Sequence, residues 1–278
     1  MTRFVSPAVL AIVASIAACA SFTTADSGAG DAGALPDAAS DASAGDAAVP
    51  EGGAQPLVGY PAAILADRPL GYWRLGESIG PVAKDETGHF DGRYAGACAL
   101  GVPGAVASDT AAHLDGKSCT VDLGDTFRFT KNAPFSIEAW VLPDPTATAF
   151  LHIFTREVRQ AGPADGYAMV LESRMAAYAE RAENGSNQRT PGTPVPQNAF
   201  AHLVATYDGA TLRMYVDGKA DTKAVVGDSA SMNDVVAHAF IGSTGTGNFF
   251  NGTIDEVAIY DKALTPAQVQ AHHDAASR

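Results

Sequence analysis

The sequence predicts an all-β domain, a β-sandwich, with a short helix at the carboxyl end of the chain. Short runs of β-branched and aromatic residues recur over residues 57–262, and Asp-Gly or Asn-Gly turn dipeptides separate them. This spacing is typical of a β-sandwich. Residues 175–183 are the best candidate for another helix, although a strand and a surface loop would also fit there.

The composition describes a soluble core with an acidic excess. The chain has 278 residues, of which 46% are hydrophobic and 18% charged, and its formal net charge is -13. Lys and Arg total 18 against 31 acidic residues, so no basic surface is available to neutralise phosphates. We therefore expect no nucleic-acid partner, and one folded domain or at most two.

Residues 1–19 have the pattern of an export signal. Arg3 precedes an apolar run that extends to Ala18. A membrane-spanning helix needs roughly 20 residues, so this run is too short for a permanent transmembrane anchor. Its last four residues, Ile16-Ala17-Ala18-Cys19, resemble the bacterial lipobox.

The lipobox resemblance implies that Cys19 carries a lipid and becomes the first residue after cleavage. Attachment to the membrane would then be through this lipid only. Ala20, in place of Asp, implies an outer-membrane or cell-surface lipoprotein. The alternative is ordinary cleavage after Ala18 or Ala20, which would release a soluble secreted or periplasmic protein.

Residues 20–55 predict a disordered acidic linker rich in Ala, Asp and Gly. They include five aspartates and Glu51 but no Lys or Arg, and hold almost no large apolar side chain. Residues 28–33 match Gly-x-Gly-x-x-Gly, but neither the strand nor the helix of a dinucleotide site flanks them. The folded domain is therefore expected over residues 56–278, with 17 basic and 25 acidic residues.

Residues 135–141 alternate as a strand does. Phe135, Ile137, Ala139 and Val141 share one face, and Ser136, Glu138 and Trp140 share the other. We expect the first face to enter the core and the second to be half polar.

Residues 202–218 predict a three-strand meander. The runs His202–Tyr207 and Thr211–Val216 are each followed by an Asp-Gly pair. Such pairs supply the positive φ angles that tight hairpin turns require.

The carboxyl end predicts one more strand and a helix. The strand covers Thr253–Tyr260, and Thr265 and Pro266 then fit the N-cap and the first position of a helix that continues to about Ala276.

Two cysteines of the folded domain predict a disulfide. Cys98 and Cys119 are 21 positions apart in a domain expected to be exported, where disulfides persist.

The order of these motifs resembles the laminin-G-like members of the concanavalin A-like lectin and glucanase superfamily. The matching segments span nearly all of residues 60–276 and are residues 72–77, Asp85 with Gly88, and residues 102–105, 113–116, 135–141, 202–207, 214–218, 240–242 and 250–260 with Leu264. The resemblance implies a jelly-roll sandwich of two antiparallel sheets whose concave face and edge loops commonly bind glycans or proteins.

The carboxylate pattern argues against catalysis. A retaining glucanase on this scaffold would carry Glu-x-Asp-x-Glu on one strand, and the chain lacks that pattern. Asp255 and Glu256 are adjacent and are expected to face opposite sides, while Glu138 stands alone. We therefore expect a non-catalytic cell-surface module that binds an extracellular carbohydrate or protein. The alternatives are a divergent glycoside hydrolase and a structural module that binds an envelope protein.

Calcium is implied by the resemblance, because related domains often hold this ion. Asp255 near the end of the domain, together with Glu77 or Asp85 near its beginning, is the expected ligand set. The alternative is that these acidic residues are exposed and bind no metal.

Aromatic and amide side chains outside the core pattern are the candidate ligand contacts. They are Trp140, Tyr178, Phe249 and Phe250, with the loop Asn184-Gly185-Ser186-Asn187-Gln188. The alternative places Trp140 and the two phenylalanines in the core. The sequence therefore assigns no ligand-binding residue and no oligomeric state.

Overall fold

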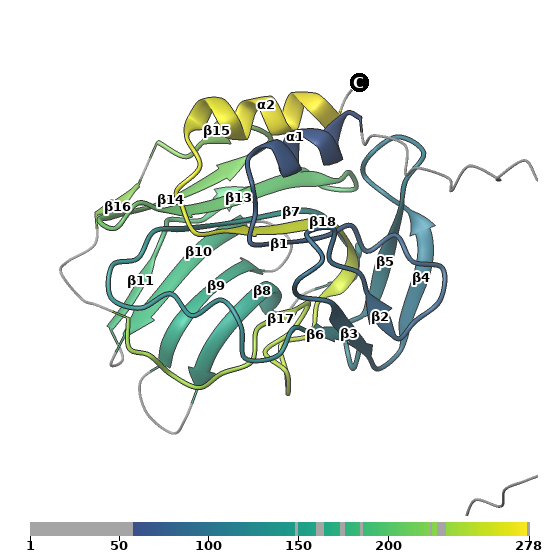
Figure 1. Cartoon of the computed structure of the whole chain (residues 1–278), viewed down its shortest axis with the longest axis horizontal. Helices are drawn as coiled ribbons and strands as arrows, with labels where there is room; N and C mark the ends of the chain where they lie inside the picture. The colour runs from purple at the N-terminus through teal and green to yellow at the C-terminus, as the bar shows by residue number, and fades with distance from the viewer. Residues whose placement is uncertain are drawn as a thin grey trace, which may run out of the picture. The chain divides into compact units, whose positions relative to one another are not determined.

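Two antiparallel sheets packed against each other form the folded part of the chain (Figure 1). The computed structural model describes residues 58–147, 150–159, 164–172, 176–183, 186–222, 224–226 and 232–276. The export signal, Cys19 and the acidic linker lie outside the described residues. The predicted all-β sandwich with a short carboxyl-terminal helix is confirmed.

The first sheet, sheet A, has the strand order β15-β14-β13-β7-β18-β5-β4, with β1 also paired to β18 and β16 to β14. Its strands are β1 (Gly71–Trp73), β4 (Cys98–Pro103), β5 (Thr110–Asp115), β7 (Phe135–Pro143), β13 (Ala201–Tyr207), β14 (Thr211–Val216), β15 (Lys219–Ala220), β16 (Val225–Val226) and β18 (Asn251–Tyr260).

The second sheet, sheet B, has the order β11-β10-β9-β8-β17-β6-β3-β2, with β12 also paired to β10. Its strands are β2 (Val82–Ala83), β3 (Gly92–Ala95), β6 (Thr120–Asp122), β8 (Phe150–Arg159), β9 (Ala164–Glu172), β10 (Ala176–Glu183), β11 (Ser186–Arg189), β12 (Thr193–Pro194) and β17 (Phe240–Ile241). The segment that was the best candidate for another helix is therefore strand β10.

The core lies between the sheets and is rich in aromatic rings. Phe135 of sheet A packs on Tyr167 of sheet B with ring centroids 4.7 Å apart. Ile137, Ala139 and Val141 follow Phe135 along the same face of β7 and are fully buried. The predicted inward face of this strand is confirmed.

The predicted meander is also confirmed. Strand β13 pairs antiparallel with β14, and β14 pairs with β15. Asp217 and Gly218 join β14 to β15 with φ angles of 50° and 76°. Two successive positive φ angles characterise the tight hairpin turn that Asp-Gly favours.

Helix α2 (Pro266–Ala276) begins with a capping box. The Gln268 amide donates to Thr265 Oγ1 at 3.3 Å, and the Thr265 amide donates to Gln268 Oε1 at 2.9 Å. A second helix, α1 (Tyr60–Ala66), was not predicted from the sequence. No helix in the described part of the chain is long and apolar enough to cross a membrane.

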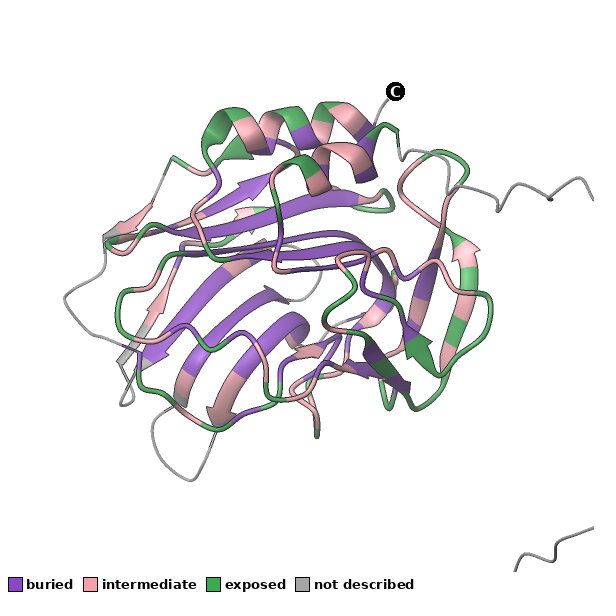
Figure 2. Ribbon diagram, viewed as in Figure 1, coloured by how far each residue is buried: buried purple, intermediate pink, exposed green. Residues whose placement is uncertain are grey.

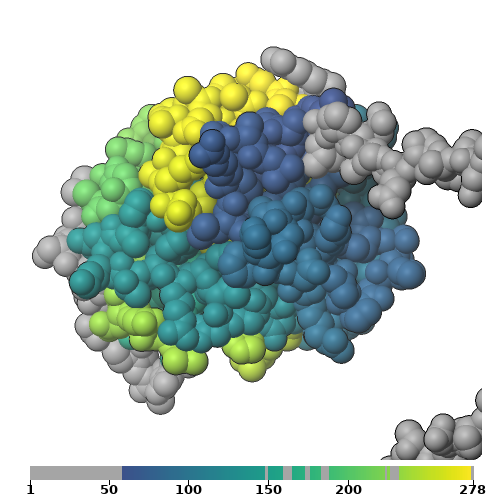
Figure 3. All heavy atoms as spheres, viewed as in Figure 1, coloured from purple at the N-terminus to yellow at the C-terminus, as the bar shows by residue number. Residues whose placement is uncertain are grey.

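The two helices lie side by side on the outer face of sheet A (Figure 3). They cover the face of β7 that the alternation predicted to be half polar, and β7 has the colour of buried residues in Figure 2. Ser136, Glu138 and Trp140 are all buried. Sheet A is therefore enclosed on both sides along β7.

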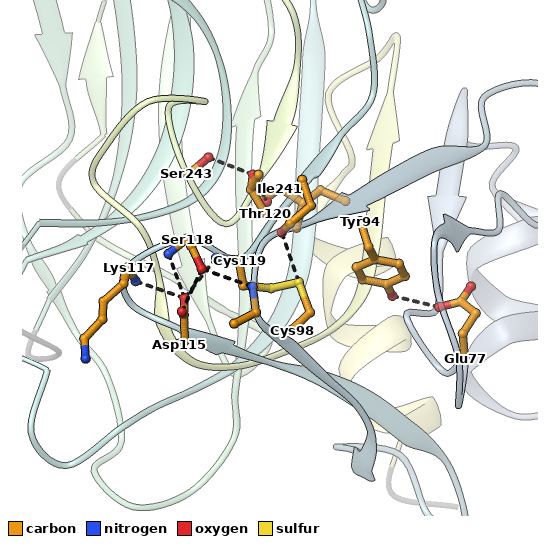
Figure 4. The surroundings of a disulfide bond; sticks show 12 residues. Glu77, Tyr94, Cys98, Asp115, Lys117, Ser118, Cys119, Thr120, Ile241 and Ser243 are labelled. Atoms are coloured by element: carbon orange, nitrogen blue, oxygen red, sulfur yellow. Dashed lines mark hydrogen bonds between the residues drawn. A yellow bond between two sulfur atoms is a disulfide. The ribbon is translucent and has the colours of Figure 1, made fainter.

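The disulfide predicted between Cys98 and Cys119 is present and joins the two sheets (Figure 4). Cys98 begins β4 of sheet A, and Cys119 immediately precedes β6 of sheet B. The Asp115 carboxylate holds the connecting turn by accepting the amides of Lys117, Ser118 and Cys119. A bridge of this loop length contributes about 3 kcal/mol by restricting the unfolded chain.

Candidate functional site

The outer face of sheet B is the sheet surface that the described helices leave uncovered. Both α1 and α2 pack on sheet A, where Tyr60, Ile64 and Val269 meet Val204 and Tyr215. No described helix therefore lies between a ligand and the outer face of sheet B, although most side chains of that face are buried.

Strand pairing determines which side chains share this outer face. Leu151, Met169 and Ala177 point into the core. Their neighbours along β8, β9, β10 and β11 point outward, in register-matched rows. The rows are Phe150 with Glu172; His152 with Val170 and Tyr178; and Thr155 with Ala168, Glu180 and Arg189.

Arg189 holds two aromatic rings in place on this face. Its guanidinium carbon lies 3.5 Å from the ring centroid of Tyr178 and 4.7 Å from that of Phe150. Its Nε lies 2.9 Å from Glu180 Oε1, and its Nη2 lies 3.3 Å from Glu172 Oε2. The two carboxylates balance the cation, so the group presents fixed aromatic rings rather than a net positive charge. We call these five residues the aromatic platform.

Burial, followed by the neighbouring Glu172 carboxylate, raises the pKa of Tyr178 above its ordinary value. The phenol is therefore neutral at physiological pH. Arg189 already covers one face of the Tyr178 ring, so a ligand can stack on the other face only, and the hydroxyl forms a hydrogen bond with Glu172.

Beside the platform, the centre of the face is buried and internally bonded. His152 Nδ1 lies 2.7 Å from Thr155 Oγ1, and the Asn248 side chain lies 3.3 Å from His152 Nε2. The loop after β17 thus packs on His152. A ligand on this face would therefore contact the partly exposed Phe150, Tyr178 and Arg189.

The sequence singled out Tyr178 on this face but missed the other members of the platform. Phe150 belongs to β8 and Arg189 to β11, two strands separated by 26 residues, and only strand pairing brings the two side chains together. The alternation of Tyr178 and Glu180 with Ala177 and Ala179 was the sequence pattern that could have placed Tyr178 and Glu180 on one face of a strand.

The other predicted ligand contacts lie elsewhere. Trp140 is 7% exposed and stacks on His273 beneath α2. Phe250 is fully buried in the core, and Phe249 is half-buried. Within the predicted loop, residues 184–185 lie outside the described residues, and residues 186–188 belong to β11.

A second chemically distinctive feature is a cluster of three carboxylates in the middle of β18, beside the residue that precedes β5. One oxygen from each of Asp109, Asp255 and Glu256 lies within 4.8 Å of the other two. Arg74 forms ion pairs with Asp109 and with Glu256. Tyr72 donates its hydroxyl to Glu256.

The expectation that Asp255 and Glu256 face opposite sides of their strand was wrong. Glu256 has a φ of 53°, and the register between β18 and β7 shifts between Asp255 and Ala258. This bulge interrupts the alternation and turns both carboxylates toward one site.

Burial dominates the electrostatics of the cluster. It raises the pKa of Asp255 to about 7, although the Ala105 amide opposes the shift. Burial, and then the contact with Asp109, raises the pKa of Glu256 to about 9. Asp255 Oδ1 is buried and has no hydrogen-bond partner, whereas Oδ2 accepts the Ala105 amide at 2.7 Å.

The structure groups Asp255 with Asp109 and Glu256 rather than with Glu77 and Asp85. Asp85 accepts the backbone amides of Tyr72, Thr87, His89 and Phe90. Although burial opposes the shift, the Thr87 hydroxyl and these amides lower the pKa of Asp85. Its carboxylate organises the turn after β2.

Glu77 lies nearer the cluster. It accepts the Lys84 amide at 2.7 Å and the Tyr94 hydroxyl at 2.7 Å. It also shares a cleft of about 250 Å³ with Arg74 and Asp109. Asp255 and Glu256 do not line this cleft.

A family model described as the concanavalin A-like lectin/glucanases superfamily matches residues 115–270. No curated protein matches the sequence.

Solved structures share the fold at low sequence identity. Domain 4 of an extracellular GH43 arabinanase from Geobacillus stearothermophilus, solved with arabinotriose, has a TM-score of 0.54 and 19% identity, and the match covers 73% of this chain and 96% of that domain. The binding domain of botulinum neurotoxin DC, solved with SialylT, has a TM-score of 0.58 and 12% identity, covering 76% of this chain and 51% of that one.

The same toxin domain has also been solved with rat synaptotagmin II; that match has a TM-score of 0.58 and 12% identity and covers 77% of this chain and 52% of that one. The chain thus spans nearly all of the arabinanase domain but about half of the toxin binding domain. At these identities the likeness concerns the fold.

Proposed function

Because the chain belongs to the concanavalin A-like lectin/glucanase superfamily, we propose that its folded part is a non-catalytic module that binds an extracellular carbohydrate through sheet B. The aromatic platform of Phe150, Glu172, Tyr178, Glu180 and Arg189 is the observation that carries this proposal. Aromatic faces stack on the apolar faces of sugar rings, and rings that are already held in place lose little entropy on binding.

The ligands of the structural neighbours support a binding role. The arabinanase domain was solved with arabinotriose, and the toxin binding domain with SialylT. The toxin domain was also solved with a protein, rat synaptotagmin II. A protein partner is therefore the alternative outcome of the binding experiment.

The burial of the acidic cluster disfavours the alternative of a glycoside hydrolase. A glycosidase places two carboxylates on either side of the bond that it cleaves. Asp255 and Glu256 are fully buried and do not line the adjacent cleft. Carboxylates in this position are better suited to structure or metal binding.

The binding proposal is tested by applying the full-length protein to a glycan array, with calcium and with chelator. We expect saturable binding to a restricted class of sugars. Tyr178→Ala is expected to weaken it about tenfold or more, since losing an aromatic anchor typically costs over 1 kcal/mol. Tyr178→Phe keeps the ring and is the matched control, expected to retain binding.

Wild-type binding by Tyr178→Ala would show that the platform is not the site. A folded protein that binds no glycan would instead direct the search to a protein partner, through cross-linking on intact cells.

We propose calcium as the ion of the acidic cluster, which it would enter by displacing the Arg74 side chain and the proton of Glu256. The ion prefers six to eight oxygen ligands from carboxylates and backbone carbonyls. Asp109, Asp255 and Glu256 offer carboxylate oxygens, and the unpartnered Asp255 Oδ1 is available to a cation. Bound calcium would supply positive charge and no redox chemistry. Its ligands would join β18 to the segment preceding β5, which is a structural role.

We also propose that Cys19 anchors the protein to the outer membrane or cell surface through a lipid, with residues 20–55 as a spacer. The support is the lipobox resemblance of residues 16–19. In cells supplied with a radioactive fatty acid, the wild-type protein and the control Ser21→Ala are expected to be labelled. Cys19→Ser is expected to remain unlabelled. Label on Cys19→Ser, or none on the wild type, would contradict the anchor.

A further inference from the structure

The carboxylate of Glu138 is the centre of a buried polar network beneath the two helices. Glu138 lies on β7 and is fully buried. Its Oε1 accepts the Tyr60 hydroxyl of α1 at 2.8 Å and lies 2.7 Å from His202 Nε2 of β13. Its Oε2 accepts the Tyr260 hydroxyl of β18 at 3.1 Å. The network therefore joins sheet A to the helix that covers it.

His272 extends this network to α2. Its Nδ1 lies 3.0 Å from Glu138 Oε2, and its Nε2 lies 3.0 Å from Oδ2 of Asp67, at the end of α1. The residue is 2% exposed. Both ring nitrogens thus face carboxylate oxygens.

This geometry requires a specific protonation state. An ionised carboxylate only accepts hydrogen bonds, and a neutral imidazole donates only one. His272 satisfies Glu138 and Asp67 together only when both of its nitrogens carry protons. His202 has a different environment, because its Nε2 faces Glu138 and its Nδ1 has no hydrogen-bond partner. The neutral form of His202 satisfies its contact.

We propose that His272 is a pH-sensitive latch: its doubly protonated ring fastens α2 to β7 and to the end of α1, and loss of one proton loosens α2 from sheet A. After that loss, one nitrogen directs a lone pair at a carboxylate instead of donating to it. One of the two contacts is then replaced by repulsion. The proposal concerns the face opposite the aromatic platform and does not depend on the proposed ligand.

The electrostatic surroundings of His272 favour this state. Burial alone would lower its pKa, but Glu138 and Asp67 raise the pKa above the ordinary value of 6.5. The latch is therefore complete below pH 6.5 and is lost as the pH rises through the raised pKa of His272.

Three other ionisable groups of the network, Tyr60, Tyr260 and Glu138, keep one protonation state over the pH range in which His272 loses its proton. Burial and Glu138 raise the pKa values of Tyr60 and Tyr260 well above 10, so both phenols remain neutral. Burial opposes ionisation of Glu138, but His272 and His202 hold its pKa well below 4.5. Further charged or titratable groups near His272 are Lys262, which donates to the Asp67 carbonyl, and His273 and Asp274 of α2.

Hydrogen exchange of the full-length protein between pH 5 and pH 9 tests the latch, after correction for the pH dependence of intrinsic exchange. Helix α2, followed through peptides from residues 264–276, is expected to open more often, and so to exchange faster, as the pH rises. The opening equilibrium should change about tenfold for each unit by which the pKa of His272 exceeds its unfolded value. Peptides from residues 150–159 of sheet B are the internal reference and should change little.

His272→Gln and His273→Gln form a matched pair on the same helix. His272→Gln cannot titrate, so α2 should exchange rapidly and without the pH step, whereas His273→Gln should keep the wild-type profile. If His272→Gln does not fold, an NMR titration of the histidine Cε1 protons of the wild-type protein tests the latch instead. A His272 midpoint above 6.5 that coincides with α2 opening supports the latch. Constant α2 protection over this range, or loss of the step in His273→Gln, would overturn it.

Discussion

Replacing Glu138 by alanine is expected to lower the free energy of unfolding by about 3–5 kcal/mol, the usual cost of breaking a buried charged network by removing one partner. The substitution removes the carboxylate faced by the hydroxyls of Tyr60 and Tyr260, by His202 Nε2 and by His272 Nδ1. Unsatisfied buried donors retain their desolvation cost, which adds to the loss. Urea unfolding at pH 6 measures the difference.

Asp261→Ala is the control, because Asp261 is an exposed acid next to β18. It is expected to change stability by less than about 0.5 kcal/mol. Glu138→Gln, which keeps one acceptor, should fall between the two. A Glu138→Ala protein that is as stable as Asp261→Ala would mean that the network contributes no net stability.

The pH dependence of this effect has a defined sign. The pKa of Glu138 is held below its ordinary value of 4.5 in the folded protein. A carboxyl group with a lowered pKa stabilises the fold above its unfolded pKa, and this stabilisation is lost as the pH falls. The difference between wild type and Glu138→Ala should therefore shrink as the pH decreases below about 4.5.

Calcium is expected to raise the melting temperature of the wild-type protein, and a chelator is expected to reverse the rise. At a free calcium concentration one hundred times Kd, binding to the folded state alone adds about 2.7 kcal/mol. Asp255→Asn removes a carboxylate from the centre of the acidic cluster but can still accept the Ala105 amide. This variant is expected to lose most of the calcium response in differential scanning calorimetry.

Glu77→Gln tests whether calcium is held by the observed cluster or by the ligand set expected from the sequence, which included Glu77. It should keep the calcium response if Asp109, Asp255 and Glu256 hold the ion. Loss of the response in Glu77→Gln but not in Asp255→Asn would identify the other set. A wild-type protein whose melting temperature is unchanged by calcium and by chelator would remove the metal proposal.

Local patterns were sufficient to predict much of the fold. Alternation along Phe135–Val141 identified the core face of β7, and the two Asp-Gly pairs of residues 208–218 marked the turns of the meander. The Thr265-Pro266 pair located the start of α2. These features depend on residues a few positions apart, so the sequence displays them directly.

The candidate sites were less predictable because each depends on long-range packing or on a break in a local pattern. Asp255 and Glu256 share one cluster only because the bulge in β18 places Glu256 at a positive φ. Arg189 reaches Phe150 only because β8, β9, β10 and β11 pair side by side in one sheet. Neither arrangement has a signature in neighbouring residues.

The sequence by itself determined strands β7, β13, β14 and β18, the turns of the meander, the disulfide partners and the cap of the terminal helix. Each follows from local preference or from a small set of cysteines. The tertiary structure decided what lies against each strand. Alternation assigns a side chain to a face, but it does not reveal whether water, a helix or another carboxylate covers that face. Glu138 shows the difference: its outward position was readable in β7, whereas its four hydrogen-bonding partners came from α1, β13, β18 and α2.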